Sequence, residues 1–218
     1  GFTGRIVLVG EEVWRPYERP PLSKAVLTED PEPDILYFHP EQRYAELGIE
    51  LALGVPVEAV QPDEHCLRLA DGRRLDYDKL ALTVGGAARR LPIPGGDRAL
   101  YLRTLEDERA IRARLATARR VVCIGAGVIG LEIASSACAR GGAVTVLEAL
   151  PRAMGRAVSP EGAAFIEALH RDAGVALHFG VIVDRLDQAA GGGVVVTCRD
   201  GSGFEADVVV AGVGMQRN

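Results

Sequence analysis

Hydrophobic and polar positions alternate in blocks along the second half of the chain. The pattern predicts three helices. The first begins at Thr104, where acidic residues favour the first turn, the second covers residues 128–140, and the third runs from Ser159-Pro160 to Gly174. Short apolar runs predict strands at residues 120–124, 144–147, 176–179, 193–198 and 207–212. Strands that alternate with helices are typical of a doubly wound parallel sheet, so the pattern predicts an α/β fold.

The first part of the chain has a less regular pattern. It opens on the apolar run Ile6–Val9, which stops at Gly10 and two glutamates and predicts a strand buried on both faces of a parallel sheet. A proline-rich loop follows, then a short helix near residues 43–47 and β-like stretches near residues 50–60, 65–70 and 75–77. The run Leu80–Val84 predicts a further strand ahead of a Pro/Gly linker. We therefore expect one unit over residues 1–98 and a second over residues 99–213.

Composition narrows the class of protein. With 218 residues, 48% of them hydrophobic and 25% charged, the chain can form an ordinary globular core. No apolar stretch approaches the roughly 18 residues of a membrane span, and the N-terminus does not resemble a signal peptide. The net charge of −5 disfavours nucleic acid as a partner. The four cysteines form no C-x-x-C pair, so we expect a cytoplasmic protein with no metal site, no nucleic-acid partner and no membrane partner.

The stretch "VVCIGAGVIGLEIASSACARGGAVTVLE" carries the strongest functional signal. Gly125, Gly127 and Gly130 form G-x-G-x-x-G after a predicted strand and at the start of a helix, and Glu148 ends the next strand. The first glycine permits a tight turn, the second lets a pyrophosphate approach the backbone, and the third lets helix pack on strand. The helix N-terminus offers free N–H groups to phosphates. This arrangement predicts a dinucleotide site.

The choice between NAD and NADP depends on charges around that site. Glu148 can accept hydrogen bonds from a ribose diol and would repel a 2′-phosphate, which favours NAD. Arg152 and Arg156 follow closely in the sequence, and either can neutralise a phosphate. The preference for NAD therefore stays open at this point.

The opening "RIVLVGEE" is the same kind of element as "AVTVLE", an apolar strand that delivers a carboxylate. By this analogy Glu11 serves a second dinucleotide. A βαβ unit needs roughly 30 residues, and only four precede Arg5. We therefore expect that the chain starts partway through a fold and that residues 1–98 are compromised, while the second unit folds and binds its nucleotide.

Four stretches, "RPYERPPLSKAVL", "YLRTLEDERAIR", "VVCIGAGVIGLE" and "FEADVVVAGVGMQRN", closely resemble FAD-dependent ferredoxin and rubredoxin reductases of oxygenase electron-transfer chains. The resemblance implies two Rossmann-like dinucleotide-binding domains. An NAD domain at residues 99–213 would be inserted in an incomplete FAD domain formed by residues 1–98 and 214–218. It also implies FAD and NAD as cofactors, NADH as the reductant, and a ferredoxin or rubredoxin as the iron–sulfur acceptor.

The resemblance assigns five residues to the flavin. Glu11 matches the acid on the adenosine ribose, and Val57 matches a backbone contact to the adenine. Arg19 and Lys24 belong to a loop against the flavin, and Arg103 matches an FAD-contacting arginine. Simpler alternatives are that Arg19 only fixes the proline loop, that Lys24 is a solvated loop lysine, and that Arg103 pairs with the acidic residues just after it.

In the NAD domain the resemblance places the three glycines on the pyrophosphate and Glu148 on the ribose. Glu132 would lie near the nicotinamide and pair with Lys24 at the junction with the flavin, so these two form the candidate catalytic pair. The alternative for Glu132 is that it only complements the helix dipole. The implied cofactor-binding set is completed by Val128, Ile129, Arg156 and Gly214.

Some features depart from the family pattern and keep other functions open. The family's usual "ATG" reads Thr83-Val84-Gly85 here, its closing "G-x-G-x-x-P-N" has Arg217 before Asn218, and its later "GD" segment does not follow. The disulfide-reductase branch is disfavoured because no C-x-x-x-x-C pair occurs. The alternatives are a non-catalytic NAD-binding fragment or remnant, and an NADH oxidase or nitrite-reductase-like flavoprotein.

Overall fold

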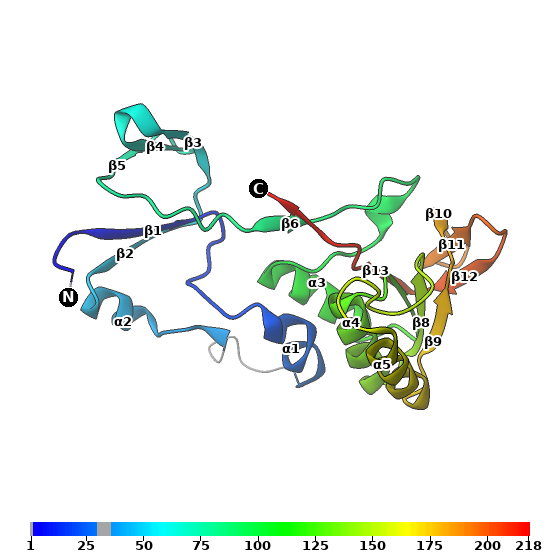
Figure 1. The fold of residues 1–218 in the computed structure, drawn as a ribbon. Coiled ribbons are helices and arrows are strands. Elements are labelled where there is room, and N and C mark those ends of the chain that lie inside the picture. Colours follow the sequence, from blue (N-terminus) through cyan, green and yellow to red (C-terminus); the bar gives the residue numbers. More distant parts are fainter. Residues whose placement is uncertain (1, 30–35) are drawn as a thin grey trace. The chain divides into compact units, whose positions relative to one another are not determined.

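The computed structural model describes residues 2–29 and 36–218 (Figure 1). The chain divides into two compact units. The smaller unit holds residues 1–18 and 32–83, and the larger unit holds residues 19–31 and 84–218. Each unit is described by itself below.

The smaller unit contains a parallel strand pair and an antiparallel sheet. Strand β1 (Ile6–Gly10) pairs in parallel with β2 (Ile49–Leu53), and helix α2 (Glu41–Glu46) packs against β2. The antiparallel sheet has the order β3-β4-β5, with bounds Val57–Gln61, Cys66–Leu69 and Arg74–Asp76 and a short 3-10 turn, Pro62–Glu64, after β3. The short helix and the β-like stretches expected from the sequence are confirmed.

Two details predicted for this unit are wrong. Strand β1 is parallel as expected, but it is only half-buried, because β2 is its one partner among the described residues. The apolar run Leu80–Val84 forms no strand, and Leu82 and Val84 are 63% and 60% exposed. An apolar run becomes a strand only where its backbone groups find a ladder partner, and these residues have none within the part of the chain that is described.

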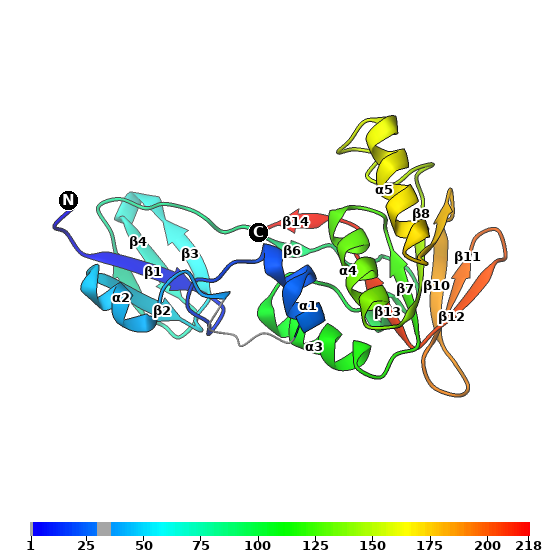
Figure 2. The same ribbon diagram turned by 90° about the horizontal axis from the view of Figure 1, so that it is seen from below.

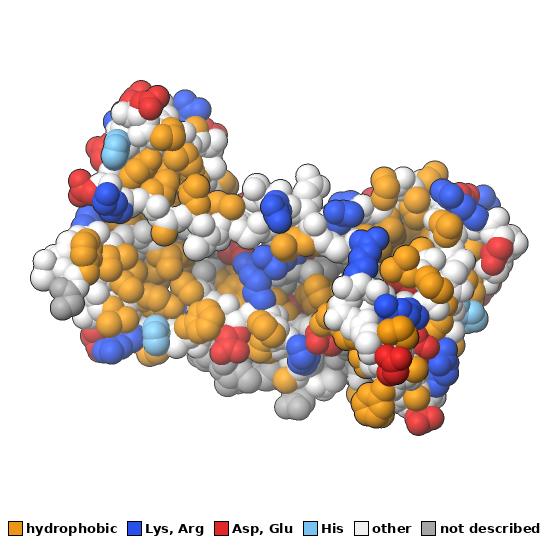
Figure 3. Space-filling model, viewed as in Figure 1, with side chains coloured by type: hydrophobic (Ala, Val, Ile, Leu, Met, Phe, Trp, Pro, Cys, Tyr) orange, Lys and Arg blue, Asp and Glu red, His pale blue; other side chains and the backbone are white. Residues whose placement is uncertain are grey.

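Hydrophobic side chains gather on the surface of the smaller unit. Figure 3 shows them over the part that carries β1 to β5. The large exposed hydrophobic residues of this unit are Phe2, Ile6, Val13, Phe38, Leu47, Val57, Val60 and Leu82. Several such residues on one small unit leave it with less buried apolar surface, and therefore less stabilisation, than the larger unit.

The larger unit is built on a four-stranded parallel sheet with the order β13-β7-β8-β9. Helix α4 (Val128–Ala139) connects β7 to β8 and packs on both, and helix α5 (Pro160–Asp172) connects β8 to β9. The strand bounds are Val208–Ala211 for β13, Arg120–Ile124 for β7, Ala143–Glu148 for β8 and Ala176–Phe179 for β9. The α/β class and the parallel sheet predicted from the sequence are confirmed.

Helix α3 (Leu105–Leu115) leads into β7 and has a well-defined start. Thr104 accepts a hydrogen bond from the backbone N–H of Asp107 at 3.2 Å, and Asp107 accepts one from the N–H of Thr104 at 2.8 Å. This reciprocal capping box satisfies two N–H groups that the helix itself leaves unpaired. The predicted start at Thr104 is confirmed.

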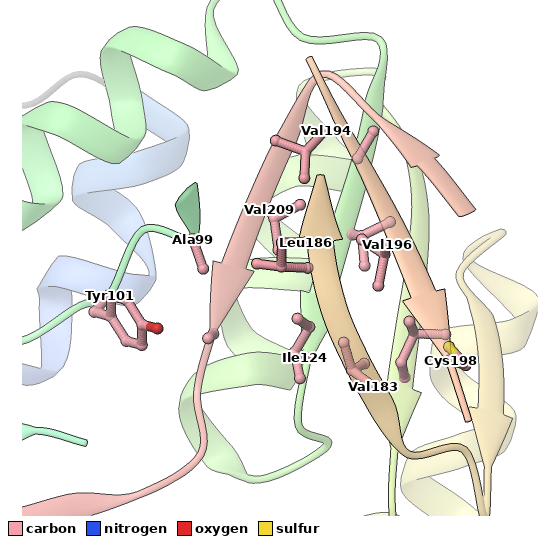
Figure 4. Packing of buried hydrophobic residues seen from close by; sticks show 13 residues of the cluster. Ala99, Tyr101, Ile124, Val183, Leu186, Val194, Val196, Cys198 and Val209 are labelled. Atoms are coloured by element: carbon pink, nitrogen blue, oxygen red, sulfur yellow. The ribbon is translucent and has the colours of Figure 1, made fainter. Parts of the chain in front are cut away.

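The other face of the sheet is covered by an antiparallel meander, not by further parallel strands. Its strands β10 (Val183–Gln188), β11 (Val194–Cys198) and β12 (Gly203–Ala206) are joined by short glycine-containing turns, which suit antiparallel pairing. The strand predicted at residues 193–198 is confirmed as β11, but it belongs to this meander and not to the parallel sheet. Figure 4 shows the core between the two layers, where Ile124 and Val209 of the sheet lie near Leu186 and Val196 of the meander. Burial of each such side chain contributes about 1.5–3 kcal/mol.

A segment from the first part of the sequence belongs to the larger unit. The turn Pro20–Ser23 and helix α1 (Ala25–Glu29) pack on α4, and α1 also contacts α3 (Figure 2). Strands β6 (Gly86–Ala88) and β14 (Met215–Arg217) form an antiparallel pair in the same unit. A short 3-10 turn follows β6 at Gly96–Arg98. The sequence pattern predicted neither α1 nor this docking.

The boundaries of the compact units differ from the domains expected at residues 1–98 and 99–213, because residues 19–31 and 84–98 join the larger unit. The assignment of the two parts to FAD and NAD stays a prediction. Among the described residues, no helix has the length and apolar character that crossing a membrane requires.

Candidate dinucleotide-binding site

The glycine turn follows strand β7 and begins helix α4. Gly125 has a φ of +100°, and a Cβ there would lie 2.7 Å from the carbonyl oxygen of Gly212. A Cβ on Gly130 would lie 2.0 Å from the carbonyl oxygen of Gly125. Both positions therefore require glycine for the turn itself and for the close packing of helix against strand, as the motif predicts.

Gly127 is glycine for a different reason. Its φ of −80° is open to other residues, and the nearest atom to an added Cβ, the carbonyl oxygen of Gly212, is 3.9 Å away. Gly127 is also the N-cap of α4, and as a glycine it has no side chain that could cap that helix end. The space in front of Gly127 and the uncapped N–H groups therefore suit the close approach of an anionic group.

A cavity of about 560 Å³ opens beside this turn. It brings together most of the residues predicted to bind NAD, which come from the turn, the end of β8, the loop after it and the segment after β13. The predicted residues among its lining are Gly125, Gly127, Val128, Ile129, Glu148, Arg156 and Gly214. Gly130 does not line the cavity but lies beneath the turn. The residues present fit a dinucleotide, because the cavity offers an uncapped helix end and a carboxylate together.

Glu148 is held in place by the backbone on both sides. Its Oε2 accepts a hydrogen bond from the N–H of Ala126 at 2.6 Å, and its Oε1 accepts one from the N–H of Leu150 at 2.8 Å. Each carboxylate oxygen keeps a further lone pair for a ribose hydroxyl. The charge of Glu148 is thus fixed at the edge of the cavity, where it would repel a 2′-phosphate.

The two arginines after Glu148 have different surroundings. The guanidinium of Arg152 donates to the backbone carbonyl oxygens of Val158 and Gly155, both at 2.9 Å, so it holds its own loop together. Arg156 is exposed and lines the cavity. Arg156 is therefore the one of this pair with access to a bound phosphate.

Sequence reasoning missed Met154, which also lines the cavity. Its φ of 47° is unusual for a residue other than glycine, and its N–H donates to the carbonyl oxygen of Ala126 at 2.8 Å. This bond ties the loop after β8 to the glycine turn. No signal in the sequence indicates such a backbone conformation at a methionine.

Lys24 and Glu132 meet, as the resemblance implied. Lys24 Nζ lies 2.9 Å from Glu132 Oε1 and also donates to the carbonyl oxygen of Pro20 at 3.2 Å. Glu132 stands on α4, four residues after Val128. The alternatives that Lys24 is only solvated and that Glu132 only complements the helix dipole do not account for this contact.

Two serines that the sequence did not single out lie at the same place. Ser23 Oγ donates to Glu132 Oε2 at 2.5 Å, and Ser136 Oγ donates to the backbone carbonyl oxygen of Ser23 at 2.8 Å. The spacing of Glu132 and Ser136 puts them on one face of α4, but the sequence does not show that residue 23 packs there.

Arg19 and Arg103 are neighbours in the larger unit. The guanidinium of Arg19 donates to the backbone carbonyl oxygen of Arg103 at 2.6 Å, and Arg103 Nε donates to the carbonyl oxygen of Gly86 at 2.8 Å. Asp107 accepts from the backbone N–H of Arg103, not from its guanidinium. Glu11 and Val57 lie in the smaller unit, Glu11 exposed just after β1 and Val57 partly exposed in β3. The flavin roles of these residues stay predictions.

The cysteines provide no redox pair within the described residues. All four are free, and Cys66, Cys123 and Cys198 are buried. Burial raises the pKa of the Cys123 thiol to about 12, so it stays protonated at neutral pH and behaves as a small apolar residue in β7. No group of three His, Cys, Asp or Glu side chains that suits a metal ion occurs in the described ranges.

A parallel sheet with a glycine turn, an uncapped helix end and a carboxylate at the edge of a cavity defines a dinucleotide-binding protein. Residues 2–218 match the family described as pyridine nucleotide-disulphide oxidoreductase, and the chain belongs to that family.

Relatives within the family include several reductases. The chain is 40% identical to putidaredoxin reductase CamA from Pseudomonas putida and 38% identical to rhodocoxin reductase from Rhodococcus erythropolis, with 100% of this chain covered in each case. It is 34% identical to a rubredoxin-NAD(+) reductase from Pseudomonas putida, with 98% covered. The resemblance to ferredoxin and rubredoxin reductases is confirmed. The chain spans only about half the length of these relatives, 53%, 52% and 56%.

Solved structures show the same fold. The reductase in the covalent putidaredoxin reductase–putidaredoxin complex matches with a TM-score of 0.93 at 40% identity, over 99% of this chain and 53% of that chain. A water-forming NADH oxidase from Lactobacillus brevis, bound to NADH, matches with a TM-score of 0.88 at 24% identity, over 98% of this chain and 48% of that chain. The second match shows the fold alone.

Proposed function

We propose that the protein is an NADH-dependent flavoprotein oxidoreductase that passes hydride from NADH to FAD and electrons onward to a ferredoxin or rubredoxin of an oxygenase system. Family membership and the relatives named as ferredoxin and rubredoxin reductases support this proposal. The chain works in the cytoplasm, in keeping with its composition.

The observation that carries the proposal is the cavity of about 560 Å³ at the glycine turn. Its open space in front of Gly127 and the uncapped start of α4 suit the pyrophosphate of NADH. Glu148 would accept hydrogen bonds from the ribose hydroxyls. Arg156, in the loop after β8, would face the phosphates.

The bound nicotinamide and flavin supply the redox chemistry, which is hydride transfer between their rings. The chain's own residues bind and orient them. Lys24 would place a positive charge beside the flavin, where reduction makes the ring more negative. Glu132 would hold that ammonium through the contact at 2.9 Å. Arg19 and Arg103 would keep the segment around Lys24 attached to the rest of the unit.

An anaerobic titration tests the function. NADH added to the purified chain supplied with FAD should bleach the visible absorption of the flavin, and an iron–sulfur ferredoxin added next should restore it. NADH binding without bleaching would instead favour a non-catalytic NAD-binding module. Recovery of the absorption with O₂ but not with ferredoxin or rubredoxin would favour an NADH oxidase.

A further inference from the structure

Two buried serines form a chain of hydrogen bonds that ends at the carboxylate of Glu132. Ser23 and Ser136 are each 4% exposed. Ser23 Oγ donates to Glu132 Oε2 at 2.5 Å, while Lys24 Nζ lies 2.9 Å from Oε1. The two oxygens of one carboxylate are thus contacted by two consecutive residues.

Helix α4 presents Ser136 one turn after Glu132 on the same face. Ser136 Oγ donates to the backbone carbonyl oxygen of Ser23 at 2.8 Å. Both α4 side chains therefore contact residue 23, Glu132 at its hydroxyl and Ser136 at its backbone. This pairing fixes the position of Ser23 relative to α4.

The ion pair alone would be a weak constraint. The side chain of Lys24 is 52% exposed and that of Glu132 is 25% exposed. A lysine side chain with this exposure keeps much of its conformational freedom. A short hydrogen bond from a buried hydroxyl to a carboxylate is stronger and more directional. The orientation of Glu132 is therefore set by Ser23, and Lys24 follows it.

We propose that Ser23 is a positioning residue for the Lys24–Glu132 pair, with Ser136 holding the backbone of Ser23. The importance of this pair for hydride transfer rests on the proposed function. By binding one oxygen of Glu132, Ser23 leaves the other oxygen for Lys24 and aims the ammonium in one direction.

The chain offers an internal reference for a test, because Lys24 and the exposed Lys79 are its two lysines. Trace acylation of the chain with acetic anhydride, followed by mass spectrometry, gives the ratio of Lys24 to Lys79 labelling. Glu132→Gln should raise this ratio about threefold, the scale of one partly exposed ion pair. Ser23→Ala should raise it about twofold, because the hydrogen bond that orients Glu132 is lost.

The double variant separates positioning from general loosening. If Ser23 acts through Glu132, then Ser23→Ala adds nothing to the ratio once Glu132→Gln is present. Thr28→Ala is the matched control, since the Thr28 hydroxyl donates to the backbone carbonyl oxygens of Lys24 and Ala25 and not to Glu132. It should leave the ratio unchanged. If Ser23→Ala unfolds the chain, Ser23→Cys replaces it in the test. Cysteine is similar in size to serine but its thiol is a weak donor, so this variant should also raise the ratio of Lys24 to Lys79 labelling.

An unchanged ratio in folded Ser23→Ala, with circular dichroism like that of the parent chain, would overturn the proposal. A full additional increase in the double variant would overturn it as well. The labelling needs neither NADH nor FAD, so it stands apart from the proposed function. Failure of NADH to bind, with the labelling pattern as expected, would refute the function and leave the positioning role intact.

Discussion

The three glycines of the turn are glycine for different physical reasons. All three were predicted from one motif, yet a Cβ would overlap backbone atoms at Gly125 and Gly130 and make only an ordinary van der Waals contact at Gly127. The motif already assigns Gly127 to a ligand and the other two glycines to the fold, and the space around each Cβ position agrees with that division. Ser23, in contrast, belongs to no pattern that would distinguish it from other serines in the sequence.

This difference gives a paired prediction. Gly127→Ala should cost less than about 1 kcal/mol of stability, because its φ suits alanine, but should weaken NADH binding by about tenfold or more. Gly130→Ala should cost more than about 3 kcal/mol, because its Cβ would overlap the carbonyl oxygen of Gly125. Thermal melts and calorimetric titration with NADH measure both effects. Unchanged NADH affinity in a folded Gly127→Ala chain would contradict the assignment.

Glu148 and Arg156 give a prediction about nucleotide choice. Glu148→Gln removes the charge at the edge of the cavity, so NADH should bind about tenfold more weakly while NADPH loses less or gains affinity. Adding Arg156→Ala should reverse the shift toward NADPH, because Arg156 is the arginine with access to the cavity. Titrations with both nucleotides measure the ratio. Arg152→Ala in the same background is the comparison, and it should lower stability without restoring the preference.

At the scale of elements, the sequence predicted the regular part well. The elements β7, α4, β8, α5 and β9 stand within one residue or two of their expected bounds, because each has both a clear apolar pattern and a cap or glycine stop. It predicted β11 as a strand but not the sheet to which it belongs, since an apolar run carries no information about its neighbours. Helix α1 was missed because five residues are too few for a period, and its position depends on contacts with α4.

The start of β13 provides a pH-dependent test at this scale. Asp207 accepts hydrogen bonds from the backbone N–H groups of Arg120 and Arg119, both at 2.9 Å, and these lower its pKa below the ordinary 3.8. An unfolded carboxylate protonates near that ordinary value. The stabilisation is therefore complete above about pH 4 and is lost as the pH falls through the lower folded pKa.

Asp207→Asn should lower stability at pH 7 by about 1 kcal/mol and make the acid side of the stability curve flatter. Melting temperatures measured from neutral pH to about pH 2 would show both changes. Asp187→Asn is the control, because the carboxylate of Asp187 is paired with the exposed Arg185 of the same strand. Equal effects of the two variants would show that Asp207 does not tie β13 to β7.

At the scale of the whole molecule, the two units differ in how deeply their strands are buried. The strands β7 and β13 are almost entirely buried, whereas β1 is half-buried and pairs with β2 alone among the described residues. The hydrophobic pattern did not show that residues 19–31 join the larger unit, because this depends on contacts between a loop and a helix that lie more than 100 residues apart in the sequence. Only the resemblance brought Lys24 of that loop to Glu132 of the helix.

Amide hydrogen exchange should follow this difference. Amides of β7 and β13 should exchange about 100-fold or more slowly than those of β1 and β2, because local opening requires less free energy in a small, exposed sheet. Exchange followed by mass spectrometry of peptic fragments resolves these strands. Equal protection of the four strands would show that the chain opens as one cooperative body.

An NMR titration of the ¹⁵N-labelled chain with NADH shows whether the glycine turn of the larger unit holds this nucleotide. Added NADH should shift the amides of Gly125, Gly127 and Val128 most, together with those next to Glu148 and at Arg156, and should leave β3 to β5 unchanged. Saturable shifts that map elsewhere, or no shifts at all, would show that NADH does not bind at this turn.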